Sequence, residues 1–236
     1  MARTRPEAVA GVEDVDLSDT TAVVTGATDG IGRETALGLG RLGATVIIHG
    51  RDSHKAERTV TAIERSGGEA EAILADFLDE SAVHDLADRV LETTGSLDIL
   101  INNAGASFRT GELTAAGVER TMAVNHVAPF VLTNRLADAV ESVGGRIVTV
   151  ASQVHRRVDP GDTIPLDDID SYDAFEAYGR SKFANVLFAY ALARRLESAT
   201  ATCLHPGFVP GSALWRDANP LLRVGFRLVG ALPSAI

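Results

Sequence analysis

The sequence has one cysteine, Cys203, among its 236 residues, and its six histidines are scattered. A single cysteine excludes an internal disulfide, and histidines without paired spacing give no zinc-site signature, so we expect no metal. No stretch approaches the roughly 20 apolar residues of a membrane span. The first 19 residues also lack the apolar centre of a signal peptide. We therefore expect no transmembrane span and a cytoplasmic location.

Basic residues are fewer than acidic ones. There are 22 Lys and Arg against 32 Asp and Glu, which gives a net charge of -10. Nucleic-acid binding requires a concentrated basic surface that displaces counterions, so this balance argues against a nucleic-acid partner. The hydrophobic content of 45% is enough to bury one large core.

From residue 20 onward, short β-branched apolar runs alternate with longer amphipathic segments, which is the pattern of repeated βαβ units. This predicts an α/β fold of the Rossmann type, a doubly wound parallel sheet with helices on both faces. The expected strands are 21–25, 45–49, 70–75, 97–101, 146–151 and 200–205. The expected helices are 32–42, 55–66, 81–94, 118–142 and 174–198. No linker or repeat interrupts residues 20–236, so we expect one domain preceded by a loosely attached lead-in, 1–19.

A glycine-rich turn, TGATDGIG, joins the first expected strand to the first expected helix at residues 25–32. Gly26 and Gly30 can adopt backbone angles closed to other residues and let a phosphate approach the main chain. The helix N-terminus adds N–H donors and a partial positive charge, and Gly32 lets the helix pack close to the strand. The turn predicts a pyrophosphate site, with a plain tight turn as the alternative.

Further motifs follow in order after the later strands. They are Asn102-Asn103-Ala104-Gly105, Asn125, Ser152, Tyr178-Gly179-Arg180-Ser181-Lys182 and His205-Pro206-Gly207. Together with the TGxxxGIG spacing, they resemble the short-chain dehydrogenase/reductase family over roughly residues 20–212. The segments GIGRETA, DILINNAG, YGRSKFANVLFAYALARRL and HPGFV resemble its retinol-dehydrogenase-like and WW-domain-oxidoreductase-like members.

This resemblance implies an oxidoreductase that moves a hydride between NADP(H) and a small carbonyl or alcohol substrate of lipophilic character. It assigns catalysis to Asn125, Ser152, Tyr178 and Lys182. Tyr178 is the expected general acid/base, Ser152 donates to the substrate oxygen, Lys182 binds the nicotinamide ribose, and Asn125 holds a water that relays protons towards Lys182.

The spacing of Tyr178 and Lys182 places both side chains on one helix face. A free tyrosine has a pKa of about 10, and bringing it near 7 requires roughly 4 kcal/mol. An ammonium about 4 Å away would supply that amount at an effective dielectric near 20. We therefore expect Lys182 to lower the pKa of Tyr178.

The expected cofactor contacts surround the same sheet edge. They are Gly26, Thr28, Asp29, Gly30, Ile31, Arg51, Asp76, Asn103, Ala104, Gly105, Tyr178, Lys182, Pro206, Gly207 and Val209. An NAD-preferring enzyme usually has an acidic residue after its second strand. Here Gly50 occupies that place and Arg51 follows, which favours the 2′-phosphate of NADP. Asp52 keeps NAD as an alternative, and Asp76 has a helix N-cap as its alternative role.

The match departs from the family near the C-terminus. Gly211 stands where a threonine or serine is usual, and Ser212 follows it. The chain stops at Ile236, so we expect the family's last strand to be missing and the chain to be shortened. Residues 220–236 are expected to form a substrate lid, with an oligomer contact or a membrane-surface helix as alternatives.

Two functional interpretations follow from these motifs. The first is an active oxidoreductase, which the complete catalytic set favours. The second is a non-catalytic nucleotide-binding or scaffold protein, which only the short C-terminus supports. The resemblance also implies a homodimer paired through the helices that carry the tyrosine and lysine. Finally, Ser152 and Tyr178 are 26 positions apart, and we expect the polar, acidic loop 158–172 between them to lie beside the substrate.

Overall fold

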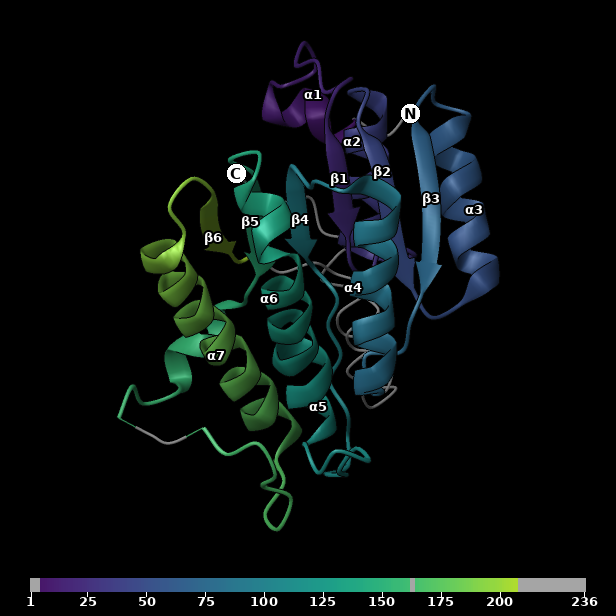
Figure 1. Cartoon of the computed structure of the whole chain (residues 1–236). Helices are drawn as coiled ribbons and strands as arrows, with labels where there is room; N and C mark the ends of the chain where they lie inside the picture. The colour runs from purple at the N-terminus through teal and green to yellow at the C-terminus, as the bar shows by residue number, and fades with distance from the viewer. Residues whose placement is uncertain (1–4, 162–163, 208–236) are drawn as a thin grey trace.

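A computed structural model describes residues 5–161 and 164–207. Within these residues one parallel sheet is flanked by helices (Figure 1). Its strands are β1 (Thr21–Val24), β2 (Thr45–Gly50), β3 (Glu69–Leu74), β4 (Ile99–Asn102), β5 (Arg146–Val150) and β6 (Thr200–Leu204). The helical elements are α1 (Pro6–Ala10), α2 (Gly30–Arg41), α3 (Ser53–Glu64), α4 (Glu80–Thr94), α5 (Arg120–Met122), η1 (Ala123–Val127), α6 (Ala128–Glu141), η2 (Gln153–Arg157) and α7 (Ala174–Arg195).

The strand order in the sheet is β3-β2-β1-β4-β5-β6. Every neighbouring pair is parallel, for example Val24 beside Ile48 and Val24 beside Ile101. Each strand is followed by a helical crossover before the next strand begins. The prediction of a doubly wound parallel α/β sheet is therefore confirmed.

The core lies in two layers because successive strand residues point to opposite faces of a sheet. Val23 and Ile47 pack in one cluster with side chains of α4, α6 and α7. Val24 and Ile48 pack in the other cluster with α2 and α3. Figure 1 shows α4, α6 and α7 side by side across the face of the sheet that is turned to the viewer.

Aspartates fix the starts of three helices. The carboxylates of Asp52, Asp79 and Asp173 accept main-chain N–H groups in the first turns of α3, α4 and α7, at 3.0, 2.9 and 2.9 Å. Such caps satisfy donors that have no partner within the helix. They explain why these helices begin within two residues of the predicted positions.

The predicted helix over 118–142 is present as an uninterrupted helical segment over 120–141, but it is not α-helical throughout. The chain forms the single turn α5, then the π-helix η1, and only then α6. Pro129 accounts for the π-helical turn, because it has no N–H for the carbonyl four residues earlier and its ring crowds that carbonyl. The residue four positions before Pro129 is Asn125.

The lead-in that we expected to be loosely attached contacts the domain. The buried Glu7 of α1 forms an ion pair with Arg41 at the end of α2, with Arg41 Nη2 2.7 Å from Glu7 Oε2. The Arg41 side chain holds the pKa of Glu7 below its usual value by hydrogen bonding to the carboxylate. The division into 1–19 and 20–236 stays a prediction. Across the described chain, no helix has the length and apolar character to cross a membrane.

Leu132 of α6 is fully buried between the helices and the sheet. Replacing it with alanine should lower the free energy of unfolding by about 2–5 kcal/mol, because transfer energy is lost and a cavity remains. Urea unfolding followed by circular dichroism would measure the loss. Leu166→Ala is the matched control, since that leucine is 46% exposed. Equal losses in both variants would contradict the proposed core.

Candidate active site

The carboxyl ends of β1 and β4 meet where the strand order reverses. From this point β2 and β3 extend to one side of the sheet, and β5 and β6 extend to the other. The chain leaves β1 and β4 in opposite directions, the arrangement in which open α/β sheets form a ligand crevice between the two following loops. The glycine-rich turn 25–32 and the segment Asn103 to Gly105 lie at this crevice.

Two glycines give the turn its shape. Gly26 and Gly30 have φ angles of +65° and +53°, in the left-handed region that favours glycine. At Gly32, an added Cβ would lie 2.3 Å from Asn103 Nδ2 and 2.5 Å from the Gly26 carbonyl oxygen. The start of α2 therefore packs against the main chain of the turn, with no room for a side chain between them.

Hydrogen bonds fasten the turn to the loop after β4. Thr25 Oγ1 accepts from the main-chain N–H groups of Asn103 and Ala104, both at 3.0 Å. Asn103 Nδ2 donates to the Thr25 carbonyl at 2.8 Å. The side chain of Asn103 thus shapes the cleft, while Gly105 lies further along the same loop and is exposed.

The remaining predicted residues of the turn lie at the start of α2. Asp29 is its N-cap and accepts from Gly30 N at 2.9 Å, and its other oxygen accepts from Lys55 Nζ at 3.1 Å. Thr28 and Ile31 are half-buried on either side of this cap. The first N–H groups of a helix have no partner within the helix, so this end of α2 presents donors to an anion.

The end of β2 has no room for an acidic side chain at Gly50. A Cβ there would lie 2.4 Å from Thr28 Cγ2. The carboxylate of Asp52 is already used, since it accepts from Lys55 N at 3.0 Å and caps α3. Arg51 is exposed between them. Asp76 is exposed after β3 and accepts from Leu78 N at 3.1 Å, whereas the N-cap of α4 is Asp79.

His49 was not recognised as a site residue from the sequence. Its Nδ1 accepts from Gly26 N at 3.3 Å, its Nε2 lies 3.1 Å from the Ala75 carbonyl, and its ring stacks on Phe77 at 4.2 Å. Burial lowers the pKa of His49 to about 4, which keeps the ring neutral and able to accept from Gly26. One side chain therefore joins the glycine-rich turn to the end of β3.

Tyr178 and Lys182 lie on α7, and Ser152 follows β5. The tyrosine and lysine side chains are almost fully buried, and Lys182 Nζ lies 5.7 Å from the centre of the Tyr178 ring. Lys182 Nζ donates to the Val150 carbonyl at 2.9 Å. A side-chain hydrogen bond joins Ser152 and Tyr178. The structure therefore brings these three predicted residues together at the carboxyl end of the sheet.

The expected lowering of the Tyr178 pKa is not found. Burial raises the pKa of Tyr178 to about 12, and the hydrogen bond with Ser152 opposes this rise. The cost of removing a phenolate from water dominates the shift, and Lys182 is not among its causes. Burial also lowers the pKa of Lys182 to about 8, because its charged form is disfavoured in the same place.

Asn125 lies in η1, is fully buried and faces α7. Its Oδ1 accepts from Ala106 N at 2.7 Å, and its Nδ2 donates to the Ala106 carbonyl at 2.9 Å and to Ser181 Oγ at 3.0 Å. A Cβ placed on Gly105 would lie 3.4 Å from Asn125 Oδ1 and 3.5 Å from Lys182 Nζ. Asn125 thus holds the loop after β4 beside Lys182.

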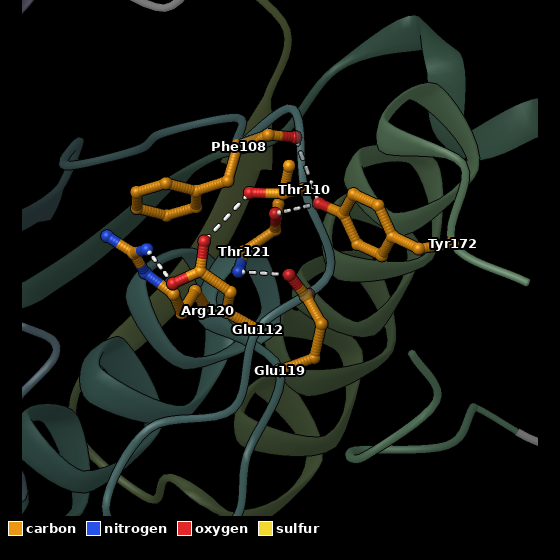
Figure 2. Close-up of polar contacts among 7 residues, drawn as sticks. All are labelled: Phe108, Thr110, Glu112, Glu119, Arg120, Thr121 and Tyr172. Carbon is orange, nitrogen blue, oxygen red and sulfur yellow. Dashed lines mark hydrogen bonds and ion pairs between the residues drawn. The ribbon is translucent and has the colours of Figure 1, made fainter. Parts of the chain in front are cut away.

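A second tyrosine fastens the chain before α7 to this loop, as Figure 2 shows. Tyr172 Oη donates to the Phe108 carbonyl at 3.0 Å and lies 2.9 Å from Thr121 Oγ1. Because Tyr172 has one hydroxyl proton, Thr121 is the donor in the second contact. The end of the 158–172 loop is therefore anchored next to a segment that begins at Gly105.

Two glutamates belong to the same network of contacts around Tyr172 (Figure 2). The buried Glu119 accepts from Thr121 N at 2.7 Å and starts α5, and its own N–H donates to the Leu166 carbonyl at 2.6 Å. Glu112 accepts from Arg120 Nη1 at 2.8 Å, and the Arg120 guanidinium lies 4.3 Å above the Phe108 ring. No motif pointed to this network, because Tyr172 lies 51 positions from Thr121 along the chain.

Pro206 and Gly207 are exposed after β6, and Gly207 has a φ of +76°. Val209, Ser212 and the segment 220–236 lie outside the described residues. The described part fits a dinucleotide: the turn leaves the main chain of Gly30 open, and the N-terminus of α2 points donors towards that space. Gly26, Gly30, Ile31 and the Asn103 to Gly105 loop would hold the pyrophosphate and nicotinamide half, and Arg51 and Asp76 would hold the adenosine half.

Comparisons with known proteins match this architecture. A model of the short chain dehydrogenase family matches residues 20–220. Polyprenol dehydrogenase of Mus musculus is 36% identical over 223 residues, which cover 89% of this chain and 66% of that protein. Retinol dehydrogenase 14 of Homo sapiens is 37% identical over 210 residues, which cover 80% of this chain and 61% of that protein. This chain thus spans about two thirds of the length of the curated relatives it matches.

A solved structure has the same fold and a related sequence. The short chain dehydrogenase from Burkholderia cenocepacia, solved in complex with NADP, superposes with a TM-score of 0.68 and is 35% identical. The match covers 81% of this chain and 75% of that one. With the glycine-rich turn, the buried Tyr178 and Lys182 pair and a family model that matches most of its length, this chain belongs to the short-chain dehydrogenase/reductase family and resembles its retinol dehydrogenases.

Proposed function

We propose that this protein is an NADP(H)-dependent oxidoreductase that interconverts a lipophilic carbonyl compound and the corresponding alcohol. The observation that carries the proposal is that Ser152, Tyr178 and Lys182 lie together at the same end of the sheet as the glycine-rich turn. The lipophilic substrate class is supported by the relatives, which are named for retinol and polyprenol.

The bound cofactor would supply or accept the hydride. Ser152 donates a hydrogen bond to the substrate oxygen, and Tyr178 passes a proton to that oxygen during reduction or takes it during oxidation. The Lys182 ammonium favours the phenolate that reduction leaves behind. Asn125 holds a water that restores protons towards Lys182. Its main-chain carbonyl is the acceptor that we assign to this water, since its side chain is held by Ala106 and Ser181.

Burial holds Tyr178 in its protonated form. Its pKa is raised to about 12 by burial, so at neutral pH it carries the proton that a reduced carbonyl must receive. Oxidation would start from the phenolate, which burial makes costly.

Tyr178→Phe should lower kcat at least about 100-fold, because the proton donor is lost, while NADPH binding changes little. Binding is measured by NADPH fluorescence and turnover by NADPH depletion with a panel of lipophilic aldehydes and ketones. Tyr190→Phe, on the same helix and 62% exposed, is the control. A wild-type protein that binds NADPH but reduces none of these compounds would instead support the non-catalytic interpretation.

The preference for NADP has three structural supports. Gly50 leaves no room for the acidic side chain that binds the ribose of NAD, and the Asp52 carboxylate is held as the cap of α3. Arg51 is exposed between them, with no ion pair among the described residues. A guanidinium there would bind a 2′-phosphate through charge-assisted hydrogen bonds.

Arg51→Ala should therefore weaken NADPH binding about tenfold or more and leave NADH binding unchanged, since charge-assisted hydrogen bonds contribute about 1.5–3 kcal/mol. Fluorescence titration with each nucleotide measures the ratio. Arg58→Ala, an exposed arginine on α3, is the control. An equal loss for both nucleotides would show that Arg51 does not read the phosphate.

We also propose that two copies pair through α6 and α7. Phe130, Leu187 and Tyr190 are 45%, 49% and 62% exposed on these helices, and the ring of Phe130 lies 4.9 Å from that of Phe188 on α7. Apolar side chains gathered on adjacent helices favour association.

Leu187→Glu should shift the protein from dimer to monomer, because it places a charge in the apolar contact. Sedimentation velocity at several concentrations checks this. Leu113→Glu, at a leucine that is 42% exposed in the loop after β4, should leave the dimer intact. A wild-type chain that sediments only as a monomer would contradict the pairing.

A further inference from the structure

The main-chain carbonyl of Asn125 loses its ordinary helical partner. In an α-helix this oxygen would accept from the N–H of the residue four positions later, and that residue is Pro129, which has no N–H. The chain adopts the π-helix η1 at this place. A carbonyl without its partner is costly when buried, so another donor is required.

The donor is a side chain of α7. Asn185 Nδ2 donates to the Asn125 carbonyl at 2.9 Å. Asn185 lies three residues after Lys182 and is only 2% exposed. The contact joins η1 to the helix that carries Tyr178 and Lys182, and it spans 60 positions of sequence.

His126 fixes the orientation of the Asn185 amide. Its Nδ1 lies 3.0 Å from Asn185 Oδ1. Because the amide nitrogen of Asn185 is directed to Asn125, its oxygen faces His126, and this assigns the ring proton to His126 Nδ1. Burial lowers the pKa of His126, and the nearby charge of Lys182 lowers it further, so the ring is held neutral.

The Asn125 side chain is held by Ala106 and Ser181: both Nδ2 protons are donated, and Oδ1 accepts from Ala106 N. The main-chain oxygen of Asn125 is a second acceptor on the side of α7, and it also has two lone pairs. One of them is taken by Asn185. The position of Asn185 therefore sets the direction of the other.

We propose that Asn185 is a positioning residue for proton transfer: held by His126, it orients the Asn125 carbonyl that receives the relay water beside Lys182. The inference rests on the proposed oxidoreductase function and adds two residues to it. Neither Asn185 nor His126 touches the reacting atoms. They act through Asn125.

The test compares the wild type with Asn185→Leu, Pro129→Ala and the double variant. Asn185→Leu should lower kcat for carbonyl reduction about tenfold, a part of what proton transfer contributes, with KM and NADPH binding within about twofold. The solvent deuterium isotope effect on kcat should rise, because proton transfer becomes slower. Pro129→Ala supplies the missing N–H and should also lower kcat by drawing the carbonyl into the helix.

The double variant distinguishes positioning from general damage. Once Pro129→Ala has turned the carbonyl away, removing Asn185 should cost little more, so the two effects should not add. Asn134→Leu is the matched control: its Nδ2 also donates to a carbonyl of α6, that of Phe130 at 2.7 Å, but the residue is exposed. Its kcat should equal that of the wild type.

If Asn185→Leu does not fold, His126→Phe replaces it, since it keeps the ring contacts with Phe130 and Phe188 and removes only the donor. It should lower kcat with KM unchanged. If the wild type is active but kcat or the isotope effect is unchanged by these substitutions, the positioning role is overturned and the proposed function is not. Fully additive losses in the double variant would have the same meaning. A wild type that turns over no carbonyl compound would overturn the proposed function, and this inference with it.

Discussion

The close approach of two main-chain segments, at the carboxyl ends of β1 and β4, is the constraint on which the cleft depends. Thr25 and Asn103 join them by hydrogen bonds, and Gly26 and Gly32 allow them to meet without side chains between them. This contact fixes the start of α2 and the course of the loop towards Lys182. The proposed phosphate-binding end and the proposed catalytic end of the crevice are therefore held by one structure.

Burial controls the titratable groups on both sides of that contact. It keeps His49 neutral as an acceptor for Gly26, keeps Tyr178 protonated, and makes the charge on Lys182 costly. In each case the cause is the same, because a charged form loses its hydration in the interior. The protonation states of these three groups are thus set by burial rather than by neighbouring charges.

Much of this could be predicted from the sequence, because strands and turns are encoded locally. The strand positions, the glycine-rich turn and the Tyr178 and Lys182 pair depend on short spacings, and the structure places them as predicted. The contacts of His49 and Asn185 could not be predicted, since their partners lie 23 and 60 positions away. Pro129 did give a local signal that the helix would be disturbed, but no pattern identified the side chain that donates to the Asn125 carbonyl. The pKa of Tyr178 was mispredicted because the sequence does not reveal how deeply both side chains are buried.

The π-helix η1 also determines how the following helix, α6, is rotated about its axis. Each residue of an α-helix turns the chain by about 100°, so one residue more or fewer changes which side of the following helix faces the sheet. Thr121 before η1 contacts Tyr172, Asn125 within η1 contacts Ser181, and beyond η1 Leu132 and Leu136 enter the core. A relative with one residue deleted here could keep every motif and still present them a quarter turn out of alignment. The number of residues in η1 therefore determines the orientation of α6 as much as their identities do.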